Sequence, residues 1–214
     1  MKKIDLTLYF VTDSTDKSER DFLEIVRKAC EGGVTLVQLR EKEKSTLEYF
    51  ELAKKVKLIT DEFSIPLIID DRVDIAMAVD AAGVHVGKID MPVYAARRLL
   101  GKNKIVGATA KTLEQAKKAK EEGADYLGVG AIYPTTTKVV TVITEVSMLN
   151  AIALETNMPV AAIGGLNSKN MHVLYDSMAD GIAVVSAIMK SDNPKETAMS
   201  LKRQVMENFK EKQG

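Results

Sequence analysis

The sequence has little of several features that mark particular classes of protein. Its 214 residues include one cysteine, Cys30, so an internal disulfide is excluded, and a lone thiol on an apolar helix face is expected to be inert packing. Basic and acidic residues number 30 each, and no polybasic block occurs, which argues against nucleic acids and membrane surfaces as partners. No apolar run approaches about 18 residues and the first residues do not resemble a signal peptide, so we expect a cytoplasmic protein without a membrane span.

Linkers and low-complexity tracts are also missing, and the chain is filled instead by a repeated unit of an apolar β-rich run, a polar turn and an amphipathic segment. The eight apolar runs lie at residues 6–12, 35–40, 66–71, 83–87, 104–109, 126–132, 159–165 and 181–187. Eight such units favour a single-domain (β/α)₈ TIM barrel of the α/β class over residues 1–214, with a doubly wound open sheet as the alternative. The segment at 194–211 is predicted to be the last helix of the outer ring, and the helix after Asp71 is predicted to be short.

Polar residues follow nearly every predicted strand, at the end of a barrel where active sites form. In the run VQLREK side chains alternate, so Gln38, Arg40 and Lys42 share one face, while Leu39 and Glu41 face the other way. An amide and two cations on the inner face favour a bound anion such as a phosphate group. The alternative is that the two cations pair with acids that end a neighbouring strand.

Two acids, Asp71 and Asp90, follow neighbouring apolar runs. Two carboxylates can hold Mg²⁺, which completes its coordination with water and substrate phosphates. The alternative is that each acid is the N-cap of a helix, and Asp90 fits this because Met91 and Pro92 come directly after it. The cations of the second strand favour the metal interpretation, because Arg, Lys and Mg²⁺ together are typical partners of a diphosphate.

Three further strand ends carry groups that suit a phosphate. The segment PTTTK at 134–138 offers three hydroxyls and a cation, although a solvated turn explains it equally well. Gly164–Gly165 and Val185–Ser186 follow the last two strands, where the backbone of such barrels often binds phosphate. The alternative for the glycine pair is a simple turn into a helix capped by Asn167 or Ser168.

The two histidines are not expected to act in chemistry. His85 lies between apolar residues of a strand and is interpreted as a core histidine with its hydrogen bonds satisfied, and His172 is given no role. No His/Cys metal spacing, nucleophile elbow or Walker loop occurs in the sequence.

Seven short motifs follow one another from the first strand to the last: QLREK, DDRVDIA, GVHVGKID, GATA, GVGAIYPTTTK, AIGG and VVSAI. In this order the chain resembles the thiamine-phosphate synthase family, also called thiamine phosphate pyrophosphorylase. The resemblance implies a (β/α)₈ barrel and a Mg²⁺-dependent transferase of thiamine biosynthesis. Its small phosphorylated substrates would be hydroxymethylpyrimidine diphosphate and thiazole phosphate, which are joined to thiamine phosphate with release of diphosphate.

The resemblance also assigns roles to residues at the matching motif positions. It implies that the pyrimidine diphosphate is bound by Gln38, Leu39, Arg40, Glu41, Lys42, Asp70, Thr109 and Lys138. Of these, the residues expected to take part in catalysis are Arg40, Lys42, Thr109 and Lys138. The thiazole phosphate would be bound by Thr135, Thr136, Thr137, Gly165, Val185 and Ser186, and Mg²⁺ by Asp71 and Asp90.

The chain departs from the family pattern at several places. Asp70 stands where the family usually has Asn, and a carboxylate beside a diphosphate is repulsive unless it pairs with a lysine or joins a metal. Thr109 replaces a usual Ser and keeps the hydroxyl, Lys88 replaces a usual Gln, and a β-branched segment follows Lys138 in place of a Pro/Gly-rich loop.

Three other functions compete with this interpretation. A thiazole tautomerase of the same superfamily would lack the metal aspartates and the TK ending of the motif PTTTK. A sugar-phosphate epimerase would explain the last two strands but not QLREK with two acids. A non-catalytic phosphate-binding barrel is the third alternative, and the sequence leaves the presence of a homo-oligomer open.

Overall fold

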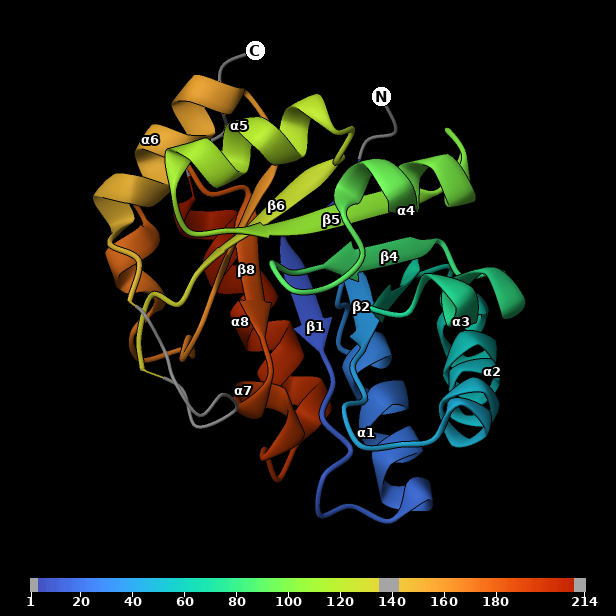
Figure 1. Ribbon diagram of the computed structural model, residues 1–214. Coiled ribbons are helices and arrows are strands. Elements are labelled where there is room, and N and C mark those ends of the chain that lie inside the picture. Colours follow the sequence, from blue (N-terminus) through green and yellow to red (C-terminus); the bar gives the residue numbers. More distant parts are fainter. Residues whose placement is uncertain (1–3, 135–142, 210–214) are drawn as a thin grey trace.

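The computed structural model describes residues 4–134 and 143–209, and its centre is a closed barrel of parallel strands (Figure 1). The strands are β1 Leu8–Val11, β2 Leu36–Leu39, β3 Leu67–Asp70, β4 Gly83–Val86, β5 Ile105–Ala110, β6 Tyr126–Gly130, β7 Val160–Ile163 and β8 Gly181–Val184. Each strand pairs with the next in sequence, and β1 pairs with β8 to close the ring. The prediction of a (β/α)₈ barrel is confirmed, and the open-sheet alternative is wrong.

Helices alternate with the strands and surround the barrel (Figure 1). They are α1 Glu19–Glu31, α2 Thr46–Glu62, α3 Val73–Ala78, α4 Val93–Leu100, α5 Leu113–Glu121, α6 Val146–Thr156, the 3₁₀ helix η1 Met171–Leu174, α7 Ser186–Met189 and α8 Pro194–Asn208. The helix α3 is short, as predicted, with six residues, and η1 takes the place of a full helix between β7 and β8. Within the described part of the chain, no helix has the length and apolar character needed to cross a membrane.

Local sequence explains where the longer helices begin. Ser45 and Glu48 form a capping box at the start of α2, in which each side chain accepts a hydrogen bond from the other residue's backbone N–H. Ser18 and Thr112 cap α1 and α5 in the same manner with their hydroxyls. These side chains satisfy backbone donors that the first turn of a helix leaves without partners, and so they fix where each loop ends.

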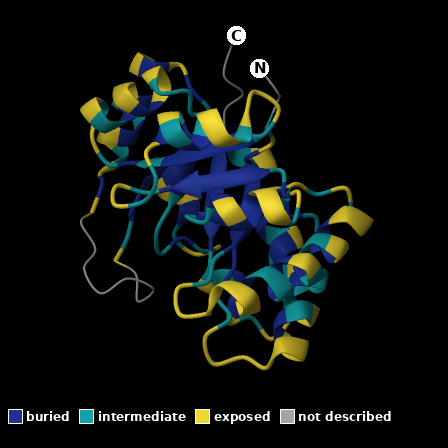
Figure 2. Ribbon diagram, turned by 45° about the vertical axis from the view of Figure 1, so that its right-hand side comes forward, coloured by how far each residue is buried: buried dark blue, intermediate teal, exposed yellow. Residues whose placement is uncertain are grey.

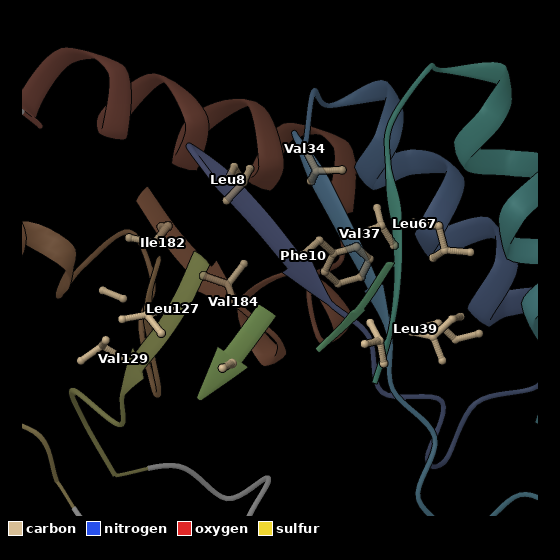
Figure 3. Packing of buried hydrophobic residues seen from close by; sticks show 14 of the residues in the cluster. Leu8, Phe10, Val34, Val37, Leu39, Leu67, Leu127, Val129, Ile182 and Val184 are labelled. Carbon is tan, nitrogen blue, oxygen red and sulfur yellow. The ribbon is translucent and has the colours of Figure 1, made fainter. Parts of the chain in front are cut away.

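The strands carry two apolar layers because successive side chains point to opposite faces. In β1, Leu8 and Phe10 point outward to the helices, and Figure 3 shows them within this outer layer. Tyr9 and Val11 point inward and join the smaller cluster inside the barrel. Figure 2 accordingly shows a buried centre of strands beneath helices whose outer faces are exposed. The inner layer is where the strands deliver polar groups to the interior.

Two glycines make room for rings inside the barrel. A Cβ atom on Gly107 of β5 would lie 2.2 Å from the ring of Tyr126, and one on Gly128 of β6 would lie 3.2 Å from the ring of His85. Any side chain at Gly107 would therefore displace the tyrosine. The two glycines let large polar rings occupy the barrel interior below the strand ends.

Candidate active site

A cavity of about 590 Å³ opens at the carboxyl ends of the strands, and this size suits a small-molecule ligand. Every strand contributes residues to its wall. The sequence-predicted residues that line it are Gln38, Arg40, Lys42, Asp70, Asp71, Asp90, Thr109, Gly165, Val185 and Ser186. The fold thus brings together residues that lie almost 150 positions apart in the chain, because parallel strands end on the same side.

Two of the predicted contact residues do not present their side chains to this cavity. Leu39 is fully buried in the outer apolar layer. The carboxylate of Glu41 accepts a hydrogen bond of 2.7 Å from the hydroxyl of Ser14, in the loop after β1. Both point away from the cavity, as the alternation of side chains predicted, so only their backbone can reach a ligand there. Thr135, Thr136, Thr137 and Lys138 lie outside the described residues.

The cations at the end of β2 are paired with the acids at the end of β3. Lys42 Nζ lies 2.7 Å from Asp70 Oδ2 and also contacts the carboxylate of Asp71. Arg40 Nε lies 3.8 Å from Asp70 Oδ2. The ion pairs that formed the alternative explanation of the β2 cations are therefore present, and an anionic ligand would compete with Asp70 and Asp71 for them.

Burial and charge shift the protonation of this cluster. Burial raises the pKa of Asp70, and the negative charge of Asp71 raises it further against the opposing effect of Lys42. For Lys42, burial acts to lower the pKa, but the two neighbouring carboxylates outweigh it and the pKa is raised. The lysine therefore stays positively charged, and its charge stabilises a carboxylate that burial disfavours.

Asp71 owes its position to an unusual backbone conformation. Its φ angle is 59°, in the left-handed region that Asp tolerates better than most residues. Its N–H donates a hydrogen bond of 2.8 Å to the carbonyl oxygen of His85 on β4. Arg72 is the N-cap residue of α3 and makes no side-chain capping bond. The capping interpretation of Asp71 is wrong, and the turn directs its carboxylate into the cavity wall.

Asp90 does not cap a helix either. Its carboxylate accepts a hydrogen bond of 2.8 Å from the N–H of Gly87, and so it closes the loop after β4. The N-cap residue of α4 is Pro92, without a side-chain capping bond. Burial raises the pKa of Asp90, and the neighbouring carboxyl of Asp71 adds to this effect. Two carboxyl groups that face each other in this way favour a cation between them.

The pair suits a magnesium ion that is completed by substrate. In the ranges 4–134 and 143–209, no group of three or more His, Cys, Asp or Glu side chains has the arrangement of a complete metal site. Mg²⁺ is often held by one or two carboxylates, with water and substrate phosphates in its other positions. Asp71 and Asp90, next to a cationic wall that suits phosphate, match that donor set.

The opposite wall, after β7 and β8, is built mainly from backbone. Gly165 has a φ angle of 65°, and a Cβ atom there would lie 2.7 Å from Cβ of Tyr133 and 2.8 Å from the carbonyl oxygen of Pro134. Only glycine satisfies both the conformation and the close approach. On the other side, α7 begins at Ser186, so the first N–H groups of this turn lie beside the cavity.

The helix that was expected to follow the glycine pair is absent. Asn170 is the N-cap residue of the 3₁₀ helix η1, and its side chain makes no capping bond to that helix. The side-chain oxygen of Asn170 instead accepts from the N–H of Asn167, while its amide donates to the carbonyl oxygen of Gly165. Capping by Asn167 or Ser168 was therefore wrong: Asn170 holds the loop in a turn that leaves Gly165 at the cavity wall.

Several residues of the cavity and of the barrel interior were missed in the sequence. Tyr9 lines the cavity and hydrogen-bonds to Tyr126, which does not line it and also bonds to His85. His85 is a core histidine with satisfied hydrogen bonds, as expected, but it lines the cavity as well. The signal was available, because both tyrosines occupy inward-facing strand positions. Lys111, which directly follows β5, lines the cavity and was also overlooked.

Comparison with known sequences gives one family for most of the chain. The family model described as thiamine monophosphate synthase matches residues 8–188. A thiamine-phosphate synthase of Methanobrevibacter smithii is 49% identical over 195 residues, which cover 91% of this chain and 93% of the relative. A thiamine-phosphate synthase of Lacticaseibacillus paracasei is 52% identical over 191 residues, or 89% of this chain and 90% of the relative.

A solved structure agrees with the sequence comparison. The thiamine phosphate pyrophosphorylase of Pyrococcus furiosus superimposes with a TM-score of 0.88 at 38% sequence identity. The match covers 97% of this chain and 98% of the other. Fold and sequence therefore point to one family over nearly the whole length.

Proposed function

The chain belongs to the thiamine monophosphate synthase family of transferases, and on this premise we propose that it joins hydroxymethylpyrimidine diphosphate to thiazole phosphate in a Mg²⁺-dependent reaction. The products would be thiamine phosphate and diphosphate. The observation that carries the proposal is a single cavity in which the cations Arg40 and Lys42 face the acid pair Asp71 and Asp90. Such a wall fits a metal-bound diphosphate better than a sugar phosphate alone.

The cations of β2 would take the diphosphate. Arg40 offers a planar fork that matches phosphate oxygens, and Lys42 offers a compact charge that can move from Asp70 and Asp71 to the ligand. Asp71 and Asp90 would hold Mg²⁺, which supplies further positive charge to the diphosphate oxygens when it is bound. Together these groups favour departure of the diphosphate, because negative charge accumulates on it as the bond to carbon breaks.

The bond changes balance without an oxidant or reductant. The C–O bond between the pyrimidine methylene carbon and the diphosphate breaks, and its electron pair leaves with the diphosphate. The aminopyrimidine ring carries the positive charge left on the methylene carbon, and the lone pair of the thiazole nitrogen forms the new C–N bond. No proton transfer is needed in these steps, so positioning of the two substrates is the main task of the protein.

The wall after β7 and β8 would hold the thiazole phosphate. Gly165 lets the backbone approach an oxyanion closely, and the N–H groups near Val185 and Ser186 are donors that suit phosphate oxygens. On the family resemblance alone, the 135–138 segment contributes hydroxyls and the charge of Lys138. The two anions would then lie on opposite walls of one cavity, which orients the ring nitrogen toward the methylene carbon.

The test is a coupling assay with purified protein. Both substrates and Mg²⁺ are supplied, and thiamine phosphate and diphosphate are measured over time. We expect the two products to form in equal amounts. A matched sample with EDTA should lose the activity and regain it with excess Mg²⁺. Absence of product with metal present would contradict the coupling function, and isomerisation of the thiazole phosphate without coupling would favour the tautomerase alternative.

A further inference from the structure

A chain of hydrogen bonds crosses the barrel interior from β2 to β5. Gln38 Nε2 donates to Tyr9 Oη over 2.5 Å, and Tyr9 Oη lies 2.7 Å from Tyr126 Oη. Tyr126 Oη lies 3.1 Å from His85 Nδ1, and His85 Nε2 lies 2.9 Å from Thr109 Oγ1. Both ends of this relay, Gln38 and Thr109, line the cavity.

The relay is well shielded from water. The exposed fractions are 2% for Tyr9, 4% for Gln38 and 8% for His85, and Tyr126 is fully buried. Burial raises the pKa of both tyrosines, so each phenol keeps its hydrogen. A buried donor without an acceptor is unfavourable, and therefore the hydrogens along the relay should arrange themselves so that each finds one.

One direction of donation gives an acceptor to both phenol hydrogens and to the imidazole hydrogen. An amide nitrogen can only donate, so Tyr9 Oη accepts from Gln38 and must pass its own single hydrogen to Tyr126. Tyr126 then passes its hydrogen to His85 Nδ1, which has to be unprotonated to accept it. The imidazole hydrogen consequently lies on Nε2 and is donated to Thr109.

This direction has a consequence at the cavity. Because Thr109 Oγ1 already accepts from His85, its hydroxyl hydrogen is free to point to a ligand in the cavity that Thr109 lines. If Tyr126 donated to Tyr9 instead, the Tyr9 hydrogen would have no acceptor within the relay, and Thr109 would have to give its hydrogen to His85.

We propose that Gln38, Tyr9 and Tyr126 act as positioning residues that hold His85 in its Nε2–H tautomer, so that Thr109 donates a hydrogen bond to an anionic oxygen of the substrate. The identity of that substrate rests on the proposed function, since the diphosphate would lie along β2 to β5. A hydrogen bond from the Thr109 hydroxyl to a developing oxyanion strengthens as the leaving group gains charge. The two tyrosines therefore support the reaction through His85 and Thr109, without touching the reacting atoms themselves.

The tautomer can be measured without any substrate. The chain has two histidines, and replacing the exposed His172 with Gln leaves His85 as the single imidazole. In ¹⁵N spectra of labelled protein we expect the signal of a protonated Nε2 and an unprotonated Nδ1. A protonated Nδ1 with an unprotonated Nε2 would overturn the inference, because the relay would then run in the opposite direction.

Two isosteric variants test whether the relay sets this tautomer. Tyr9→Phe and Tyr126→Phe each remove one link, and each should give a mixture of His85 tautomers. Tyr49→Phe is the matched control, since Tyr49 is a buried tyrosine whose hydroxyl donates to the carbonyl oxygen of Leu39 outside the relay. It should lower stability and leave the tautomer unchanged. An unchanged tautomer in both relay variants would contradict the inference.

Binding and kinetics test the role of the Thr109 hydroxyl. With Mg²⁺ present, Tyr126→Phe should weaken binding of inorganic diphosphate several-fold and lower kcat for coupling by about tenfold, while KM for thiazole phosphate stays unchanged. In a Thr109→Val background, Tyr126→Phe should have no further effect on either quantity. Equal effects in both backgrounds would contradict the inference, because Tyr126 would then act independently of the Thr109 hydroxyl.

The two proposals fail in different ways. If the protein makes no thiamine phosphate but His85 shows the Nε2–H tautomer and diphosphate binding responds to Tyr126→Phe, the coupling function is wrong and the relay stands. If coupling proceeds and Tyr126→Phe changes neither tautomer nor kcat, the relay is wrong and the coupling function stands.

Discussion

The two walls of the cavity are made from different parts of the polypeptide. The wall at β2 to β4 consists of charged side chains, in which Lys42 bridges Asp70 and Asp71. The wall at β7 and β8 consists mainly of backbone, shaped by Gly165 and the first turn of α7. Under the proposed function, the cations of the first wall would exchange their acidic partners for ligand oxygens, whereas the second wall would offer backbone N–H groups. The first wall would then take the metal-bound diphosphate and the second the monophosphate.

The largest effect is expected when the charged wall loses an acid. Asp71→Ala or Asp90→Ala should lower Mg²⁺-dependent turnover by roughly 10²- to 10³-fold with the barrel intact, because a preorganised charge at the leaving group is lost. The readouts are initial rates across a range of Mg²⁺ concentrations and circular dichroism for the fold.

The control for this pair is Asp80→Ala. Asp80 also has a left-handed φ angle, of 52°, and pairs with Lys104 away from the cavity. Asp80→Ala should lower the stability of the protein, because alanine tolerates a left-handed φ angle less well than aspartate does. It should leave turnover unchanged. Full activity in either Asp71→Ala or Asp90→Ala would remove that residue from the proposed metal site.

The wall at β7 and β8, called the backbone wall because it is built mainly from backbone, is tested by adding one carbon atom at Gly165. Gly165→Ala should raise KM for thiazole phosphate several-fold and destabilise the protein by about 1–3 kcal/mol, because the new Cβ meets Tyr133 and Pro134 in a left-handed conformation. Thermal denaturation and steady-state kinetics measure the two effects.

Gly101→Ala is the matched control for the backbone wall. Gly101 has a φ angle of 72°, but nothing lies within 4 Å of the Cβ position. This variant should be modestly less stable and kinetically normal. If Gly101→Ala raised KM for thiazole phosphate as much as Gly165→Ala does, the effect of Gly165→Ala would not come from the close approach of Gly165 to Tyr133 and Pro134.

A smaller effect is expected from Asp70→Asn. The change removes a buried carboxylate that pairs with Lys42 and Arg40 and would compete with the proposed diphosphate for them. We expect KM for the pyrimidine diphosphate to fall by roughly 3- to 10-fold, which corresponds to about 1 kcal/mol, with KM for thiazole phosphate unchanged. A rise in KM for the pyrimidine substrate would instead make Asp70 part of the productive site, as a support for Lys42 or for the metal.

The smallest effect is expected outside both walls, at Cys30 of α1. Burial raises the pKa of this thiol to about 12, so at pH 8 roughly one molecule in ten thousand carries the thiolate. Iodoacetamide should label the native protein at least about a hundred times more slowly than the urea-unfolded protein, with no loss of activity. Mass spectrometry follows the labelling, and rapid modification of native protein would contradict the burial of Cys30.

Much of the charged wall could be predicted from the sequence, and less of the backbone wall. Gln38, Arg40 and Lys42 were placed on the inner face by alternation alone, and the cavity contains all three. The exit of β7 was predicted less well, because its loop depends on Asn170, whose side chain bonds Asn167 and Gly165 rather than capping a helix. Such bonds between side chain and backbone compete with helix formation and leave no periodic pattern.

The eight apolar runs were sufficient to predict the barrel, and the residue types that follow them set the chemistry of the strand ends. The folded barrel was needed to show that Asp71 and Asp90 face each other instead of capping helices, and that Lys42 lies between two carboxylates. It was also needed to show that Tyr9 meets Tyr126 across the barrel. Apolar periodicity is local along the chain, whereas ion pairs and buried hydrogen bonds depend on which strands the closed ring brings together.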